Sequence, residues 1–126
     1  MNNPSESDQA GVATVTRFND ALNARDLAAM QALLALDTVF ENTNPPPDGQ
    51  RYAGLAAVTA FWEDFFRSSS QAHFEIEEIF GSGDRVVLRW LYHWTDPERR
   101  RGHIRGVDLY RVSAGLIAEK LSYVKG

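Results

Sequence analysis

The chain contains no cysteine. Disulfide bonds and thiolate metal sites are therefore excluded, and the composition is compatible with a reducing compartment. No apolar run approaches the roughly 20 residues that a membrane-spanning helix needs. The first residues, MNNPSESDQAG, lack the basic and apolar regions of a secretory signal. We therefore expect a cytoplasmic protein that does not enter a membrane.

Positive charge is not in excess either, because the formal net charge at pH 7 is −4. This balance argues against nucleic acid or an anionic membrane as a partner. The sequence also has no glycine-rich phosphate loop, no nucleophile elbow and no histidine pair at metal-ligand spacing. We expect neither a cofactor nor a bound metal.

What the sequence does have is enough apolar material for a core. It is 44% hydrophobic over 126 residues, a length that suits one domain. Residues 1–9 are predicted to form a polar, flexible N-terminus and residues 10–126 a single domain.

The first half of that domain shows helical periodicity. Apolar residues predict a helix over about 7–24, and Asp26 is a plausible cap for a second helix that carries Leu27 to Leu34. A short strand over 38–42 leads into a stiff, proline-rich loop at 44–49. A third helix is predicted after Gly54.

The second half favours strands joined by turns. The predicted strands are 71–80, 85–95, 102–112 and 116–124. The resulting α+β fold has three N-terminal helices packed on a curved, antiparallel mixed sheet. The strand over 86–94 is apolar on both sides, so it needs a second cover besides the helices. We expect a homodimer through the outer sheet face.

Three stretches resemble the nuclear transport factor 2-like superfamily, and its SnoaL-like polyketide cyclases in particular, with ketosteroid isomerase as a relative. They are NARDLAAMQALL, TVFENTNPPPDGQRYAGLAAVTAFWEDFF and GVDLYRVSAGLIAEKL. The resemblance covers about residues 10–124. It implies a cone-shaped fold with a deep pocket between helices and sheet. The superfamily holds cyclases, isomerases, epoxide hydrolases and proteins that only bind or scaffold.

The resemblance also implies roles for single residues. Asp108 stands where SnoaL-like cyclases carry their catalytic acid and where ketosteroid isomerase has its oxyanion-donating aspartic acid. Asn42 replaces the general base of that isomerase, and Phe18 replaces its hydrogen-bonding tyrosine. Steroid isomerisation by that route is therefore disfavoured.

Limonene epoxide hydrolases give a similar mixed match. Arg89 and Asn42 resemble pocket residues of those enzymes, whereas Leu91 and Ser122 stand where their two aspartates belong. That hydrolysis is disfavoured as well.

Asp108 is the leading candidate from the residues themselves. On a strand it shares one face with Ile104, Tyr110 and Val112. Loss of solvation favours the neutral form of a carboxyl group, which could then act as general acid or donate a hydrogen bond to an enolate oxygen. The alternative is a structural ion pair with an arginine, or a hydrogen bond to Asn42 or Tyr110.

Arg89 and His93 lie four apart on one strand and therefore share a face. His93 could pass a proton, and Arg89 could orient a substrate oxygen. Alternatively, both face the dimer interface and pair with Glu75 or Glu77. In that case the pocket is lined by the aromatic residues of the opposite face, Trp90, Tyr92 and Trp94.

Three further residues are predicted to contact substrate. Asn42 ends a strand before the proline-rich loop, where it would bind an oxygen at the rim or else cap a turn. Trp62 belongs to the aromatic stripe of the third helix, which forms core or a ligand surface. Tyr110 lies on the face of Asp108.

These features predict a cofactor-free, cyclase- or isomerase-like enzyme that transfers a proton on an apolar, carbonyl-bearing small molecule. Asp108 and His93 would be catalytic. Asn42, Arg89, Phe18, Trp62 and Tyr110 would bind substrate. The alternative is a non-catalytic small-molecule-binding or dimerisation module of the same fold.

Overall fold

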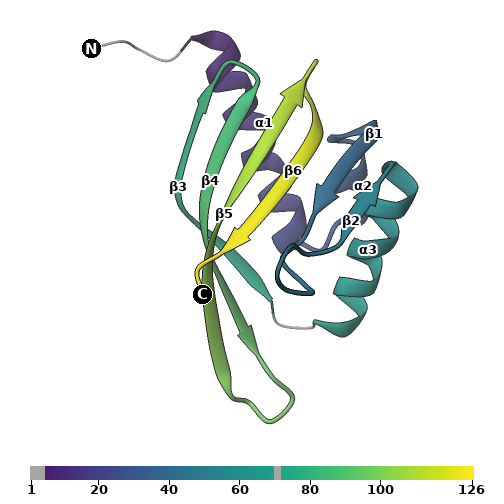
Figure 1. The fold of residues 1–126 in the computed structure, drawn as a ribbon, viewed down its shortest axis with the longest axis vertical. Coiled ribbons are helices and arrows are strands. Elements are labelled where there is room, and N and C mark those ends of the chain that lie inside the picture. Colours follow the sequence, from purple (N-terminus) through teal and green to yellow (C-terminus); the bar gives the residue numbers. More distant parts are fainter. Residues whose placement is uncertain (1–4, 70–71) are drawn as a thin grey trace.

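Three helices and six strands make up the described chain in the computed structural model, which covers residues 5–69 and 72–126 (Figure 1). The helices are α1 (Glu6–Asn23), α2 (Leu27–Gln31) and α3 (Leu55–Ser68). The strands are β1 (Leu34–Glu41), β2 (Arg51–Ala53), β3 (His73–Ser82), β4 (Arg85–Thr95), β5 (Arg101–Ser113) and β6 (Leu116–Val124). The predicted α+β class is confirmed.

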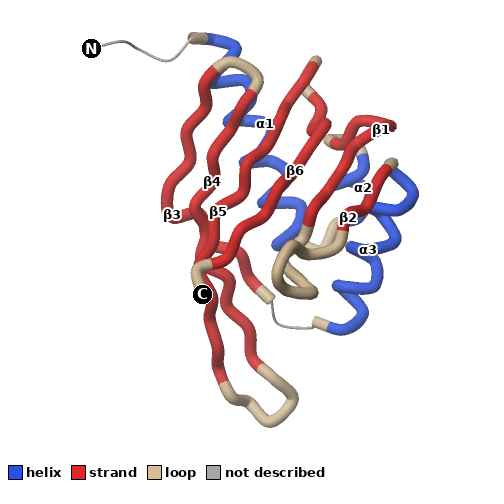
Figure 2. Tube along the Cα trace, viewed as in Figure 1, coloured by secondary structure: helices blue, strands red, loops and turns tan. Residues whose placement is uncertain are grey.

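The strands form one sheet in the order β2-β1-β6-β5-β4-β3. Strands β1 and β6 are parallel, and the other neighbours are antiparallel. The helices cover one face of this sheet, which we call the inner face (Figure 2). The hairpin of β4 and β5 extends past the rest of the molecule at the end away from α1's N-terminus (Figure 1).

Local sequence explains where the helices begin. Ser5 caps α1: its side chain accepts a hydrogen bond from the backbone N–H of Asp8, whose carboxylate accepts one from the backbone of Ser5. Asp26 caps α2 through the N–H of Ala29. Gly54, at a φ of 93°, precedes α3, in a backbone region that favours glycine.

Some boundaries differ from the prediction. Helix α2 ends at Gln31, and β1 begins at Leu34, so that residue belongs to a strand rather than to the second helix. Strand β2 was not predicted. Helix α1 begins at Glu6, inside the expected flexible segment, whose residues 1–4 lie outside the described part. Residue 71, the predicted start of β3, also lies outside it.

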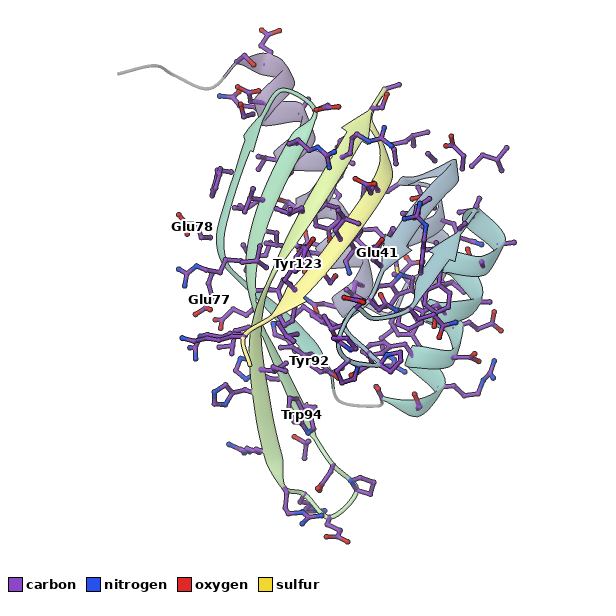
Figure 3. The ribbon with its side chains drawn as sticks, in the orientation of Figure 1. Glu41, Glu77, Glu78, Tyr92, Trp94 and Tyr123 are labelled. Atoms are coloured by element: carbon purple, nitrogen blue, oxygen red, sulfur yellow. The ribbon has the colours of Figure 1, made fainter. Side chains whose placement is uncertain are left out.

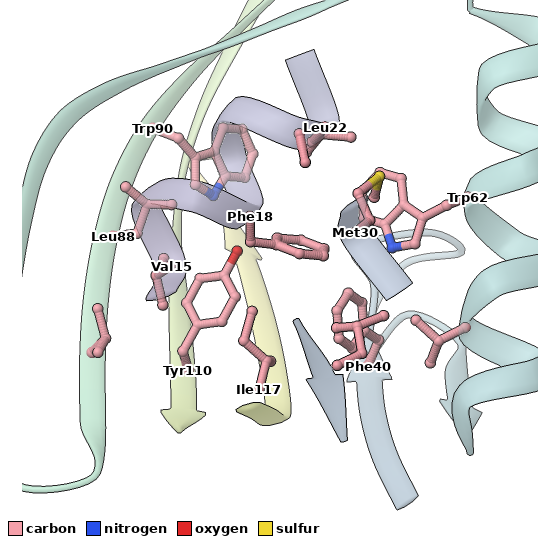
Figure 4. Packing of buried hydrophobic residues seen from close by; sticks show 14 residues of the cluster. Val15, Phe18, Leu22, Met30, Phe40, Trp62, Leu88, Trp90, Tyr110 and Ile117 are labelled. Atoms are coloured by element: carbon pink, nitrogen blue, oxygen red, sulfur yellow. The ribbon is translucent and has the colours of Figure 1, made fainter. Parts of the chain in front are cut away.

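The core lies between the helices and the inner face of the sheet (Figure 4). Phe18 of α1 is fully buried and packs edge-to-face on Phe40, Trp62 and Tyr110, with ring centroids 5.9–6.5 Å apart. This aromatic packing joins α1 and α3 to β1 and β5. No helix among the described residues is long and apolar enough to cross a membrane.

Candidate functional site

A cavity of about 920 Å³ opens between α3, the loop after β1 and the inner face of the sheet. Aromatic residues are the largest group in its walls: Tyr52, Phe61, Trp62, Phe65, Phe74, Trp90, Tyr92 and Trp94. Asn42 and the proline-rich loop contribute to the lining, as do Lys120 and Ser122 of β6. An aromatic cavity with few polar groups is typical of a small-molecule site.

Lys120 is the only charged residue that borders this cavity among the described residues. Its ammonium group donates a hydrogen bond to Ser122 Oγ at 2.8 Å and lies 3.6 Å from Asp108 Oδ2. It also lies 5.2 Å from the ring centre of Phe40 and 5.6 Å from that of Trp62. A lysine this deeply buried needs such partners, because removing a charge from water is costly.

Asp108 lies behind Lys120 in a small inner chamber of about 40 Å³. The chamber shares Lys120, Trp62 and Trp90 with the main cavity. Asp108 is only 4% exposed, and Tyr110 donates a weak hydrogen bond of 3.5 Å to its Oδ2. The pattern of its own strand predicts a lone carboxyl group among apolar neighbours. The structure instead places Asp108 in an ion pair with Lys120.

Several polar atoms around the chamber have no hydrogen-bond partner in the described chain. They are Asp108 Oδ1, Trp62 Nε1 and Trp90 Nε1. Buried groups of this kind are normally paired, so unpaired ones clustered beside a cavity are available to a ligand or to water. The chamber therefore presents one hydrogen-bond acceptor, from Asp108, and two donors, from Trp62 and Trp90.

The same buried environment changes the pKa of the Tyr110 hydroxyl group. Complete burial raises its pKa well above the usual value of 10.0, and the negative charge of Asp108 and the hydrogen bond to it raise the pKa further. Tyr110 therefore stays protonated at neutral pH and serves as a hydrogen-bond donor.

Four of the predicted site residues lie at the two hollows. Asp108 and Tyr110 line the inner chamber, Trp62 borders both, and Asn42 lines the main cavity beside the proline-rich loop. The backbone N–H of Asn42 donates to the carbonyl of Gln50, which fixes the base of that loop.

The other three predicted site residues lie elsewhere. Phe18 is buried in the core and does not border either hollow. Arg89 and His93 are on the outer face of β4, where Arg89 lies 3.3 Å from Glu78 and His93 lies 3.6 Å from Glu75. The alternation of the strand places them opposite Trp90, which borders the cavity. We therefore leave these three residues out of the candidate site.

Lys120 was missed from the sequence because a bulge changes its face. A simple hairpin register across the β5–β6 turn would place Glu119 opposite Tyr110, and Lys120 would point outward. The register shifts between Arg111 and Val112, so Lys120 pairs with Tyr110 and points inward. The signal available in the sequence was a lysine next to Glu119 in a largely apolar strand, and this pattern does not reveal the bulge.

The fold and the cavity define a class: an α+β protein with a buried lysine–aspartate ion pair at the base of an aromatic cavity. Residues 15–120 match the model of the SnoaL-like domain. The chain belongs to this family, a branch of the NTF2-like superfamily. The predicted family is thus confirmed.

Solved structures agree with this assignment. An NTF2-like protein of unknown function from Mesorhizobium loti is 37% identical, covers 98% of both chains and has a TM-score of 0.83. A Mycobacterium tuberculosis protein in complex with estradiol-17beta-hemisuccinate is 26% identical over 90% of this chain and 92% of its own, with a TM-score of 0.77. No curated protein matches the chain.

The fold extends to more distant proteins. A proposed SnoaL-like polyketide cyclase from Jannaschia has a TM-score of 0.84 at 17% identity, covering 99% of this chain and 92% of that one. At this level of identity the similarity shows the fold alone.

Proposed function

We propose that the protein binds an apolar, carbonyl-bearing ring molecule and catalyses cofactor-free proton transfer on it. The observation that carries the proposal is the buried Lys120–Asp108 pair at the base of an aromatic cavity. A water-poor cavity strengthens the electrostatic effect of such a pair on charge that develops during a reaction.

The two groups would have separate roles. Lys120 borders the main cavity, and its ammonium group would donate a hydrogen bond to the substrate oxygen as that oxygen becomes an enolate. Asp108 would accept the proton from the carbon and return it at a second position, through its unpaired Oδ1. The proton moves from carbon to carboxylate and back to carbon, so no other reactant is consumed.

The relative that binds a steroid derivative supports the class of ligand. That protein is similar over nearly the whole chain, and its ligand is a fused-ring molecule. The cavity of about 920 Å³ lies in the usual range for sites of drug-sized molecules.

Hydrogen–deuterium exchange tests the proposal. Acetylnaphthalene in deuterated water should exchange its methyl protons faster with the wild-type protein than in buffer alone, as measured by proton NMR. Asp108→Asn should bind the ketone but lose about a hundredfold or more of the exchange rate. Tyr110→Phe, which keeps the ion pair, is the control for loss of a neighbouring polar group. Unchanged exchange in a folded Asp108→Asn protein would remove Asp108 from the mechanism.

A second candidate function is ligand binding without catalysis. The observation in its favour is that Asp108 borders only the inner chamber, where Trp62, Trp90 and Lys120 separate it from the main cavity. A wild-type protein that binds the ketone tightly without accelerating exchange would support this candidate.

We also propose a homodimer through the outer face of the sheet. That face carries an apolar strip flanked by charges of both signs. The strip comprises Val87, Leu91, Val107, Leu109, Leu121 and Tyr123, of which Tyr123 is 56% exposed. A patch that is apolar at its centre and charged at its rim is typical of interfaces.

A further inference from the structure

We infer that Trp94, together with Gly102, forms an outer stacking subsite that selects ligands with an extended, flat ring system. The inference rests on the proposed function, since it concerns the same cavity, and it adds the shape of the ligand. The subsite lies on the β4–β5 hairpin, at the opposite end of the cavity wall from the Lys120–Asp108 pair.

A continuous series of aromatic rings leads from the cavity to this hairpin. Phe74 stacks on Tyr92 with ring centroids 4.5 Å apart and planes inclined by 18°. Tyr92 lies 5.4 Å from Trp94, with planes inclined by 32°. All three border the cavity. These overlapping rings extend the apolar wall of the cavity out to Trp94, the last ring of the series.

Trp94 is the most exposed ring of the series. Phe74 and Tyr92 are half-buried, whereas Trp94 is 36% exposed and is among the few large hydrophobic residues that remain open to solvent. Figure 3 shows Trp94 on the projecting hairpin, beyond Tyr92 and away from the centre of the sheet. An indole left in water at the mouth of an apolar cavity gains free energy when a ring covers it.

Gly102 is what allows this indole to lie against the sheet. It pairs with Trp94 across the two strands, and a Cβ atom at 102 would meet three ring atoms at 2.2–2.9 Å. The same arrangement recurs at Trp90 and Gly106, inside the cavity. Glycine opposite each indole therefore leaves room for both rings to lie against β5.

The length of this wall sets the size of the ligand. Trp90 borders the inner chamber, and Trp94 lies four residues further along the strand. At about 3.3 Å per residue the backbone positions of these two residues are about 13 Å apart along the strand, which exceeds the span of a single six-membered ring. A ligand with its carbonyl at Lys120 needs several fused rings to reach Trp94.

Calorimetric titration with a ketone series tests this inference. Acetophenone, acetylnaphthalene and linear acetylanthracene carry the same acetyl group on one, two and three rings. Trp94→Ala should weaken binding of acetylanthracene about fivefold to tenfold and leave that of acetophenone within twofold. Trp94→Phe should recover most of the affinity, because it restores an aromatic face.

Gly102→Ala provides a second variant that keeps the tryptophan. The added methyl group displaces the indole, so the same selective loss for acetylanthracene is expected, with circular dichroism confirming the fold.

Equal losses for all three ketones, or none, would overturn the subsite while leaving ligand binding intact. Failure of the wild-type protein to bind any ketone would overturn the proposed function and the subsite together. A change in molecular mass on Trp94→Ala would mean that the indole contacts a second copy, which also overturns it.

Discussion

At the scale of the residue, the chemistry concentrates on two charged groups that are almost excluded from water. The side chains of Lys120 and Asp108 are 8% and 6% exposed. Each charge makes the burial of the other tolerable, but neither is fully satisfied: the separation of 3.6 Å exceeds a hydrogen bond, and Asp108 Oδ1 has no partner. A buried ion pair contributes little net stability compared with apolar packing, so this pair is better explained by the proposed function than by stability.

Removing one member of the pair should be more harmful than removing both. Lys120→Met leaves the buried carboxylate without its cation, and we expect a loss of about 3 kcal/mol in the free energy of unfolding. Combining it with Asp108→Leu should recover most of that loss, because no charge then remains buried. Urea denaturation of the two single variants and the double variant measures this. Additive losses in the double variant would show that the two groups do not interact.

Tyr110 gives a prediction on alkaline stability. Its folded pKa is raised above the unfolded value of about 10, so the stabilisation is complete below pH 10 and is lost as the pH rises above it. Between pH 9 and 11, the wild-type protein should therefore lose about 1 kcal/mol more of unfolding free energy than Tyr110→Phe. Urea denaturation at both pH values measures the difference, with Tyr123→Phe as the control. Parallel losses in wild type and Tyr110→Phe would contradict the raised pKa.

At the scale of the element, the periodicity of apolar residues predicted the helices and most strands, whereas the strand register could not be predicted from the sequence. The three helices and the four strands of the second half follow from apolar spacing and turn residues. The three-residue strand β2 is too short to show a period, and its pairing with β1 depends on the loop between them. Of the candidate site, strand alternation indicated Asp108 and Tyr110, and helix spacing indicated Trp62. Asn42 was indicated by its position before the proline-rich loop.

What the sequence could not reveal depends on the bulge in the β5–β6 hairpin and on tertiary packing. A shift of one residue exchanges the faces of a strand, so the bulge in the β5–β6 hairpin decides whether Lys120 or Glu119 reaches the cavity. Parity alone also left open which face of β4 is concave, and so whether His93 or Trp90 points to the ligand. Tertiary packing of α1 and α3 resolves that choice.

The β4–β5 hairpin should tolerate a methyl group at one glycine and not at the other. At Gly106 a Cβ atom would lie 2.4 Å from the backbone oxygen of Tyr123 as well as 2.3 Å from the indole of Trp90. We expect Gly106→Ala to cost about 2 kcal/mol in unfolding free energy. Gly102→Ala meets only the side chain of Trp94 among its nearest neighbours and should cost less than about 1 kcal/mol. Thermal or urea unfolding compares the two; equal costs would mean that the backbone contact yields.

At the scale of the whole molecule, the two faces of one sheet have different partners. The inner face of β4 and β5 carries Trp90, Trp94 and Asp108. The helices cover part of this face, and the rest lines the cavity. The outer face has no cover within the described chain, yet Leu91 is only 9% exposed there and Val107 is half-buried. Long arginine and glutamate side chains around the strip shield it in part, and a second copy would complete its burial.

The dimer can be tested with two neighbouring residues of β6 that point to opposite faces. Tyr123 pairs with Val107 on the outer face, whereas Val124 pairs with Gly106 and borders the cavity. Sedimentation equilibrium should give twice the chain mass for the wild-type protein. Tyr123→Glu places a charge in the proposed interface and should shift the protein to monomers at micromolar concentration, because an unpaired charge buried there costs several kcal/mol. Val124→Glu adds the same charge on the other face and should remain dimeric. A monomeric wild-type protein, or a Tyr123→Glu protein that stays dimeric, would rule out this face as the interface and leave its apolar strip to another partner.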